Sequence, residues 1–176
     1  TLRFGAGIAS SDIGLARSGR DLVLSINGTT DQIRIHYWGM GDDYRIEQVQ
    51  FADGSSWDKA YLQSQTVGLP IVGTSIGDEL YGDEIENTLS GGAGNDTLLG
   101  GAGNDTYLFN LGDGQDTIFE SDGTAGNVDT LRFGAGIASS DIGLARSGRD
   151  LVLSINGTTD QIRIHYWGMG DDYRIE

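Results

Sequence analysis

Apolar residues recur at every ninth position through the middle of the chain, at Leu80, Leu89, Leu98 and Tyr107. The stretches between them are rich in Gly, Asp and Asn. Segments such as Thr-Leu-Leu and Thr-Tyr-Leu favour extended chain, whereas glycine-rich stretches favour loops. The pattern therefore predicts short strands separated by loops, with the four apolar residues buried against one another. A flexible acidic linker is the alternative, but a linker has no reason to keep this spacing.

Two of these units are almost the same nonapeptide. Gly91–Leu99 reads GGAGNDTLL and Gly100–Leu108 reads GGAGNDTYL. Calcium takes about 6–8 oxygen ligands and one Asp supplies only one or two, so backbone carbonyls or water must supply the rest. Glycine can adopt positive φ and turn carbonyls inward, so stacked loops of this kind can share calcium ions. An EF-hand would need alternating acidic ligands, a final Glu and flanking helices, which this region lacks.

These nonapeptides resemble the repeat of the RTX, or haemolysin-type calcium-binding, family. The resemblance implies a parallel β-roll in which alternate units form loops on opposite sides, with calcium held between neighbouring loops of one side. Looser units extend the pattern in both directions; they are Gly73–Tyr81, Gly82–Ser90, Leu111–Ile118 and Gly123–Leu131.

Alternate units define two expected ladders of metal-binding side chains. One contains Asp78, Asp96 and Asp116, and the other contains Asn87, Asp105 and Asp129. Asn87 lacks the negative charge of the other members, so its loop is expected to be a partial site. The glycines expected to shape the loops are Gly91, Gly92, Gly94, Gly100, Gly101, Gly103, Gly112 and Gly114.

The two ends of the chain carry the same sequence. Residues 1–47 and 130–176 are identical, so the repeat has a period of 129 residues. Such identity indicates either a parent protein built as a tandem array or an engineered fusion of a second copy, and the array is favoured. The shared block resembles the non-calcium β module that follows RTX repeats, which implies a cap on the open end of a roll.

Within the shared block, Asp21–Ile26 alternates apolar and polar residues, and Asn27-Gly28 is a hairpin signal before a second strand over Asp31–Trp38. Asp12–Ala16 is expected to be a connector. After the block, Ser56 is expected to cap a helix over roughly Trp57–Gln63 that lays Trp57, Ala60 and Tyr61 on the sheet.

Charge and composition limit the possible partners. Acidic residues outnumber basic ones 26 to 11, which gives a net charge of −15. Such a surface repels nucleic acid and anionic lipid, while bound cations would relieve the repulsion. The chain has no Cys for disulfides and no apolar run long enough to span a membrane.

Catalysis has almost no support in the sequence. No Gly-x-Ser-x-Gly or His-Glu-x-x-His motif occurs, and His36 and His165 are copies of one position, expected to be ordinary core or surface residues. Outward-facing threonines at Thr88, Thr97, Thr106 and Thr117 resemble an ice-binding ladder, but ordinary strand threonines are favoured.

The sequence therefore predicts an all-β protein: a short parallel β-roll of calcium-binding nonapeptide repeats flanked by β-rich cap modules. The expected domains are residues 1–66, 67–129 and 130–176. By resemblance, the parent is a secreted bacterial protein, located outside the cell or on its surface, that folds on calcium after type I secretion. A spacer in an adhesin-like array is favoured over the secretion and stability region of a hydrolase, protease or toxin. The second cap, ending before its copy of Gln48–Trp57, is expected to leave Gln161–Trp167 at an open edge where chains can associate.

Overall fold

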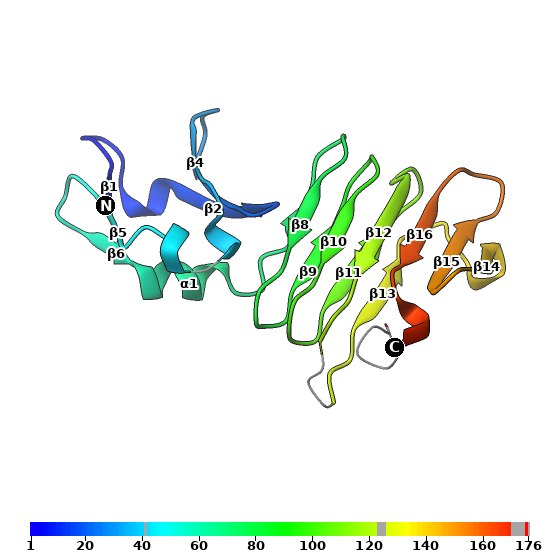
Figure 1. The fold of residues 1–176 in the computed structure, drawn as a ribbon. Coiled ribbons are helices and arrows are strands. Elements are labelled where there is room, and N and C mark those ends of the chain that lie inside the picture. Colours follow the sequence, from blue (N-terminus) through cyan, green and yellow to red (C-terminus); the bar gives the residue numbers. More distant parts are fainter. Residues whose placement is uncertain (41, 123–125, 170–174, 176) are drawn as a thin grey trace.

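The computed structural model describes residues 1–40, 42–122, 126–169 and 175. A central roll of short strands lies between two β-rich caps, the first at the N-terminal end and the second at the C-terminal end (Figure 1). The described part of the chain consists mainly of β-strands and contains one α-helix, so the predicted all-β class is confirmed.

The roll consists of two parallel layers between which the chain alternates. One layer contains β8 (Glu79–Tyr81), β10 (Thr97–Leu99) and β12 (Gln115–Phe119); the other contains β7 (Ile71–Val72), β9 (Thr88–Ser90), β11 (Thr106–Phe109) and β13 (Thr130–Phe133). Thr97 pairs with Glu79 on one side and with Thr117 on the other. Alternate nonapeptides therefore lie above one another, as the sequence predicts.

The core of the roll lies between these layers. Leu80, Leu98 and Ile118 enter it from one sheet, and Leu89 and Tyr107 enter it from the other; all five are fully buried. Each buried side chain of this size contributes about 1.5–3 kcal/mol relative to exposure. The nine-residue apolar period therefore does encode burial.

The first cap adds strands to one layer of the roll. Its elements are β1 (Leu2–Arg3), β2 (Ile13–Ser18), β3 (Asp21–Ile26), β4 (Gln32–Ile35), β5 (Gln48–Gln50), β6 (Ser56–Asp58) and α1 (Lys59–Thr66), with short 3-10 turns at Ser10–Asp12, Trp38–Met40 and Asp42–Tyr44. The antiparallel sheet β2–β3–β4 joins the roll because β2 pairs with β7. A second sheet has the order β1–β5–β6.

Three details of the first cap differ from the sequence expectation. The stretch expected to be a connector forms most of β2, which pairs with β3 along its whole length. The strand after the hairpin ends at Ile35, because Tyr37 turns the chain with φ of 61°. Asp58, rather than Ser56, caps the helix by accepting a hydrogen bond from the backbone N–H of Tyr61 at 2.7 Å. The helix buries Leu62, whereas Ala60, which was expected to lie on the sheet, is exposed.

The second cap contains the same three-stranded sheet, but it joins the roll differently. Its elements are β14 (Ile142–Ser147), β15 (Asp150–Ile155) and β16 (Gln161–Ile164), with 3-10 turns at Ser139–Asp141 and Trp167–Met169. Here β16, the copy of β4, pairs with β12. The expectation of an open edge at Gln161–Trp167 is therefore wrong, because β16 has neighbours on both sides and β14 forms the edge of its sheet.

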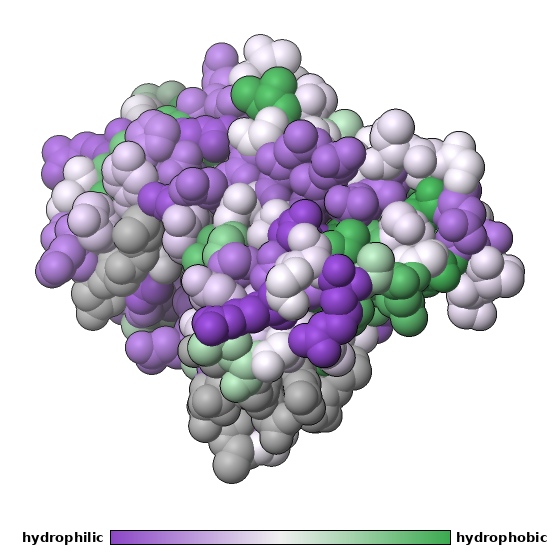
Figure 2. All heavy atoms as spheres, turned by 45° about the vertical axis from the view of Figure 1, so that its right-hand side comes forward, coloured by the Kyte–Doolittle hydropathy of each residue, from purple (hydrophilic) through white to green (hydrophobic). Residues whose placement is uncertain are grey.

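The surface agrees with the acidic composition. Hydrophilic residues cover most of the face shown in Figure 2, and apolar residues gather toward its right-hand part. Within the described residues, the single α-helix is too short and too polar to cross a membrane.

Candidate metal centre

The ladder carboxylates are held by the backbone of the preceding turn of the roll. In the first ladder, Asp96 Oδ1 accepts the backbone N–H of Asp78 at 2.7 Å, and Asp116 Oδ1 accepts that of Asp96 at 3.0 Å. In the second ladder, Asp105 Oδ1 accepts the N–H of Asn87 and Asp129 Oδ1 accepts that of Asp105, both at 2.8 Å. The structure thus brings together both sets of residues that the repeat period predicts.

The other carboxylate oxygens of three ladder residues are buried and have no hydrogen-bond donor among the described residues. These atoms are Oδ2 of Asp96, Asp105 and Asp116, whose residues are only 1–2% exposed. Burying an unpaired carboxylate costs several kcal/mol, so native proteins pair such groups or use them to bind metal. Calcium prefers oxygen ligands, and these residues therefore fit that ion.

The first glycine of each unit makes room for a carboxylate. A Cβ at Gly91 would collide with Oδ2 of Asp96, and a Cβ at Gly100 would collide with Oδ2 of Asp105. Each Asp therefore folds back over the start of its own unit. This contact requires glycine for space rather than for positive φ.

Other glycines let successive turns approach one another. Gly92 and Gly94 have φ of 84° and 139°, and a Cβ on either would press against the backbone of the turn eighteen residues earlier. Gly101 and Gly103 follow the same rule, and Gly114 meets the backbone of Gly94, twenty residues earlier. Gly112 has positive φ, but no described atom lies close to the position of its Cβ. The loops are therefore in backbone-to-backbone contact.

In the two looser units at the start of the roll, groups of the same unit donate hydrogen bonds to the ladder side chain. Asp78 Oδ2 accepts hydrogen bonds from the backbone N–H and hydroxyl of Thr74, at 2.6 and 2.7 Å. Asn87 Oδ1 accepts the N–H of Asp83 at 2.7 Å. Since these oxygens already have protein partners, the loops of Asp78 and Asn87 need an ion less than the central loops do.

Glu120 is a site residue that the repeat pattern does not predict. Glu120 is 3% exposed and lies with Asp105 and Asp129 in a group in which one carboxylate oxygen of each residue is within 4.8 Å of the others. The Tyr107 hydroxyl donates to Glu120 at 2.6 Å and accepts the N–H of Gly100 at 2.9 Å. Glu120 lies outside the nonapeptide period, so only the three-dimensional arrangement reveals it.

Two further buried carboxylates close the C-terminal end of the first ladder. Asp113 accepts the backbone N–H of Asn110 at 2.7 Å, and Asp160 accepts that of Gly112 at 2.8 Å. Asp160 belongs to the second cap, so the cap contributes directly to the last loop. The last predicted unit begins at residues 123–125, which lie outside the described part of the chain.

Burial sets the protonation behaviour of the cluster. Desolvation raises the pKa of Asp105, Asp116 and Glu120 to about 7, and neighbouring carboxylates add to the effect. The pKa of Asp96 is raised for the same reason. A bound divalent cation opposes this shift because it favours the ionised form.

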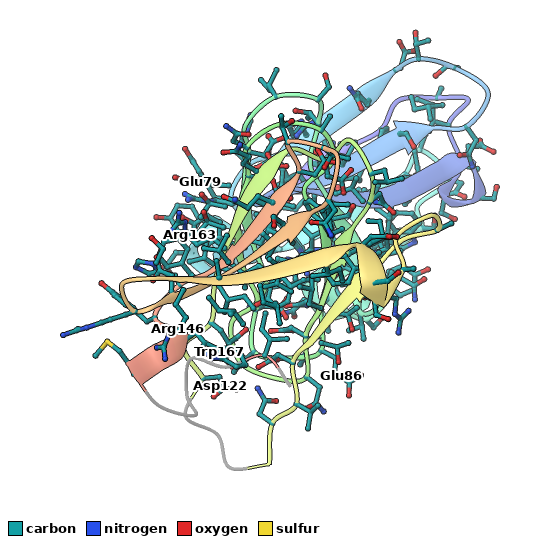
Figure 3. All side chains as sticks on the ribbon, turned by 90° about the vertical axis from the view of Figure 1, so that its right-hand side faces the viewer. Glu79, Glu86, Asp122, Arg146, Arg163 and Trp167 are labelled. Carbon is teal, nitrogen blue, oxygen red and sulfur yellow. The ribbon has the colours of Figure 1, made fainter. Side chains whose placement is uncertain are left out.

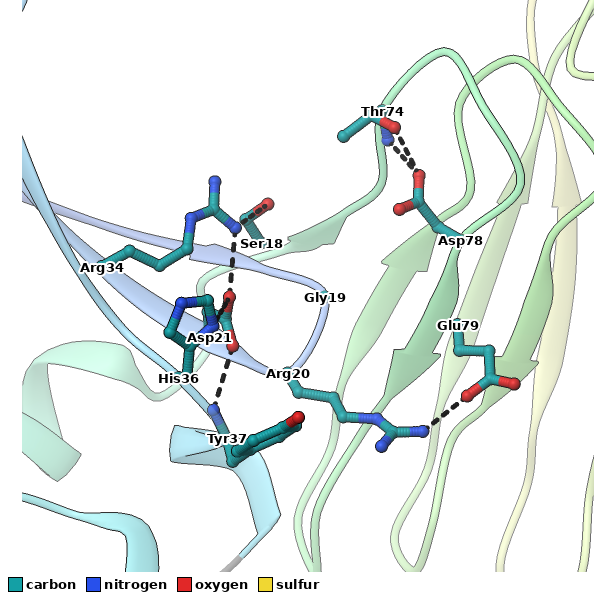
Figure 4. Close-up of a pocket in the computed structure, with 10 residues that line it drawn as sticks. All are labelled: Ser18, Gly19, Arg20, Asp21, Arg34, His36, Tyr37, Thr74, Asp78 and Glu79. Atoms are coloured by element: carbon teal, nitrogen blue, oxygen red, sulfur yellow. Dashed lines mark hydrogen bonds and ion pairs between the residues drawn. The ribbon is translucent and has the colours of Figure 1, made fainter.

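The two histidines form matching but separate contacts. His36 Nδ1 lies 3.0 Å from Asp21, and His165 Nδ1 lies 3.1 Å from Asp150. His36 borders an open surface pocket of about 280 Å³ where the first cap meets the roll (Figure 4). The structure does not bring the two histidines together.

The stacked glycine loops and the buried carboxylates define a calcium-binding β-roll. The family described as "RTX calcium-binding nonapeptide repeat (4 copies)" matches residues 72–107 and 81–118. The "Haemolysin-type calcium binding protein related domain" matches residues 21–61 and 150–176, within the two caps. The chain therefore carries RTX calcium-binding nonapeptide repeats flanked by haemolysin-type calcium-binding related domains, and its roll binds calcium.

An extracellular lipase is among the solved structures that resemble this chain. Extracellular lipase LipA from Serratia marcescens is 18% identical, with a TM-score of 0.36. The comparison covers 98% of this chain and 32% of the lipase, so this chain spans about a third of that protein's length.

Proposed function

We propose that this chain is a structural module of a secreted bacterial protein that folds when its central loops bind calcium. The three buried Oδ2 atoms without donors, on Asp96, Asp105 and Asp116, carry the proposal. Without a cation, each adds an uncompensated polar group to the folded state. With calcium, the same atoms become ligands, and binding free energy becomes folding free energy.

The proposed ligands fall into a strong and a weak group. Asp96, Asp105 and Asp116 form the strong group because their Oδ2 atoms have no donor among the described residues, and Asp129 and Glu120 join it because they lie beside Asp105. Asp78 and Asn87 form the weak group, because local donors already satisfy them. The loop glycines shape these sites and direct backbone carbonyls; they are Gly91, Gly92, Gly94, Gly100, Gly101, Gly103, Gly112 and Gly114.

The dependence on calcium suits export and function outside the cell or on its surface. The RTX resemblance supports type I secretion, in which the chain passes through the channel unfolded. Submicromolar calcium would leave carboxylate repulsion and glycine entropy to oppose folding, whereas extracellular modules bind at about 10⁻⁴–10⁻³ M. Calcium would then act as the folding signal after export.

Exact repetition supports a spacer role. The 47 residues at each end are identical, which is the pattern that a tandem array of one module produces. We therefore favour a spacer in an adhesin-like surface protein, and we assign no reaction to this chain. The alternative is the secretion and stability region of a hydrolase, protease or toxin, and a catalytic domain adjoining this sequence in the parent protein would support it.

Circular dichroism of the full chain tests the proposal. We expect residues 73–120 to be unfolded in excess chelator and to gain β structure in millimolar calcium. A variant with Asp96→Asn, Asp105→Asn and Asp116→Asn should lose this response, while the matched change Asp31→Asn at an exposed site should not. A spectrum of the unaltered chain that is the same with and without calcium would contradict the proposal.

A further inference from the structure

The two caps dock on the roll through opposite edges of the same sheet. In the first cap, β2 pairs with β7 through Arg17↔Ile71 and Ser18↔Val72, and β4 is the outer strand. In the second cap, β16 pairs with β12 through four residue pairs, from Gln115↔Gln161 to Ile118↔Ile164, and β14 is the outer strand. Each edge of the cap sheet is therefore used once within this chain.

Exposure of the same residues in the two copies shows what each docked edge covers. Ile33 in the free strand β4 is 37% exposed, whereas its copy Ile162 in the docked strand β16 is 1% exposed. Arg17 in the docked strand β2 is 5% exposed, whereas its copy Arg146 in β14 is exposed. Figure 3, viewed from the second-cap end, shows β14 across the front of the molecule with Arg146 at its periphery.

The two edges carry complementary chemistry for the two ends of a roll. The β16 edge brings Asp160 to the N–H of Gly112 in the last loop of the first ladder. Its copy, Asp31, is exposed. The acidic end of the hairpin is thus buried only where it meets the C-terminal end of a roll.

The β2 edge carries basic groups to the N-terminal end of a roll. The Arg17 guanidinium lies 3.3 Å from the Asp83 carboxylate. Arg20 lies 2.6 Å from Glu79 (Figure 4). Arg20 also stacks at 3.6 Å over the ring of Tyr81. These contacts pair the cap's cations with the first acidic residues of the roll.

Docking one edge leaves the internal pairing of the cap unchanged. Ile13↔Ile26 and Leu22↔Ile35 in the first cap correspond to Ile142↔Ile155 and Leu151↔Ile164 in the second. Because the sheet has the same register in both docked states, nothing in its pairing prevents both edges from being used at once.

We propose that the cap is a two-edged connector that joins the roll before it to the roll after it. Strand Gln32–Ile35 pairs with the β12 strand of the preceding roll, and strand Ile13–Ser18 pairs with the β7 strand of the following roll. The occupant of each free edge is therefore a roll of the adjacent period of the same chain. One layer of each roll continues through the cap into the opposite layer of the next, and the array becomes a continuous sheet. This proposal rests on the tandem arrangement proposed above.

A lengthened chain, in which residues 1–129 precede the full chain once more, tests the connector. Its middle cap has a roll on both sides. The sequence has no Cys, so a single cysteine can be introduced at one position at a time. The three positions are Ile33 of the first cap, the equivalent isoleucine of the middle cap, and Ile162 of the last cap. In calcium, we expect alkylation of the middle cysteine to be slow like that of the last, about tenfold or more slower than the first, because reaction requires local opening.

The outcomes separate the connector from the calcium-dependent fold. Fast alkylation of the middle cysteine in a chain that circular dichroism shows to be folded by calcium would overturn the connector alone. A chain that gains no β structure in calcium would overturn the proposed function and the connector with it. Small-angle scattering of the lengthened chain without cysteine gives an independent reading: a stiff rod supports the connector, and freely jointed modules overturn it.

Discussion

The hydroxyl of Tyr107 joins two neighbouring parts of the metal centre, since it donates to Glu120 at 2.6 Å and accepts the N–H of Gly100 at 2.9 Å. The ring of Tyr107 is fully buried in the core of the roll. One residue therefore fills an inward position of the nonapeptide pattern and also holds a carboxylate beside Asp105. This double role explains why an aromatic residue replaces the usual leucine in that unit.

Tyr107→Phe should lower both stability and calcium affinity. The change keeps the ring but removes the hydroxyl that bonds the N–H of Gly100 and Oε2 of Glu120, which costs about 1–3 kcal/mol. Thermal unfolding in saturating calcium measures this loss. Tyr61→Phe is the matched control, since Tyr61 is 41% exposed. Equal melting temperatures for the Tyr107 variant and the unaltered chain would show that the hydrogen bonds contribute nothing.

Asp96→Ala should weaken calcium binding more than Asn87→Ala. Asp96 provides a buried charged oxygen without a protein donor, whereas Asn87 is uncharged and hydrogen-bonded within its loop. We expect a loss of about tenfold or more for Asp96→Ala, because ligand charge sets the affinity of such sites. Calorimetric titration with calcium gives both values. Equal losses would contradict this ranking of the loops.

Asp160→Asn should reduce calcium affinity, whereas Asp31→Asn should leave it unchanged. The two residues occupy the same position in identical sequences, but Asp160 is 6% exposed beside the last loop and Asp31 is exposed. Removing the Asp160 charge takes one buried negative group from the surroundings of Asp113 and Asp116. A calcium titration of the two variants side by side provides the comparison, and identical curves would exclude a role for the cap in the last site.

The calcium-free fold should be more stable at pH 5 than at pH 8. The pKa of Asp105, Asp116 and Glu120 is raised to about 7 from ordinary values of 3.8 for Asp and 4.5 for Glu. Between these limits the folded chain binds protons that the unfolded chain has released, so stability falls as pH rises from about 4 to 7. Circular dichroism in calcium-stripped buffer checks this. A gain of β structure from pH 5 to pH 8 would contradict the prediction. Addition of excess calcium at pH 8 is the control, because it shows that the chain can still fold at that pH.

The roll could be predicted well from the sequence because the nine-residue period reflects which side chains are buried. Every ninth residue enters the core, so the burial of Leu98 could be predicted from the spacing. The stacking of every second unit, and with it the ladder position of Asp96, came from the resemblance to RTX repeats. Glu120 could not be predicted, because its role depends on the chain path after β12 rather than on the period. The same holds for Asp160, which reaches the site only through the docking of the second cap.

The cap shows a second limit of sequence reasoning. Gly14 weakens the strand pattern of Ile13–Ser18, since glycine is unfavourable in strands. In the structure, Gly14 lies opposite Ser25, and a Cβ there would come within 2.8 Å of the Ser25 hydroxyl oxygen. Tertiary packing therefore explains the glycine. No reading of the sequence could assign different docking edges to two identical blocks, because only their surroundings differ.

The contact of Gly92 and Gly94 with the turn eighteen residues earlier means that the roll has a parity. Each nonapeptide added between β10 and β12 would move every later strand to the opposite layer. An odd number of added units would turn the second cap by half a revolution about the roll axis, whereas an even number would keep its orientation. In a rigid array, the number of nonapeptides in each roll would therefore decide whether successive modules face the same way or alternate. Adding nonapeptides to the roll in pairs would keep the orientation of the second cap.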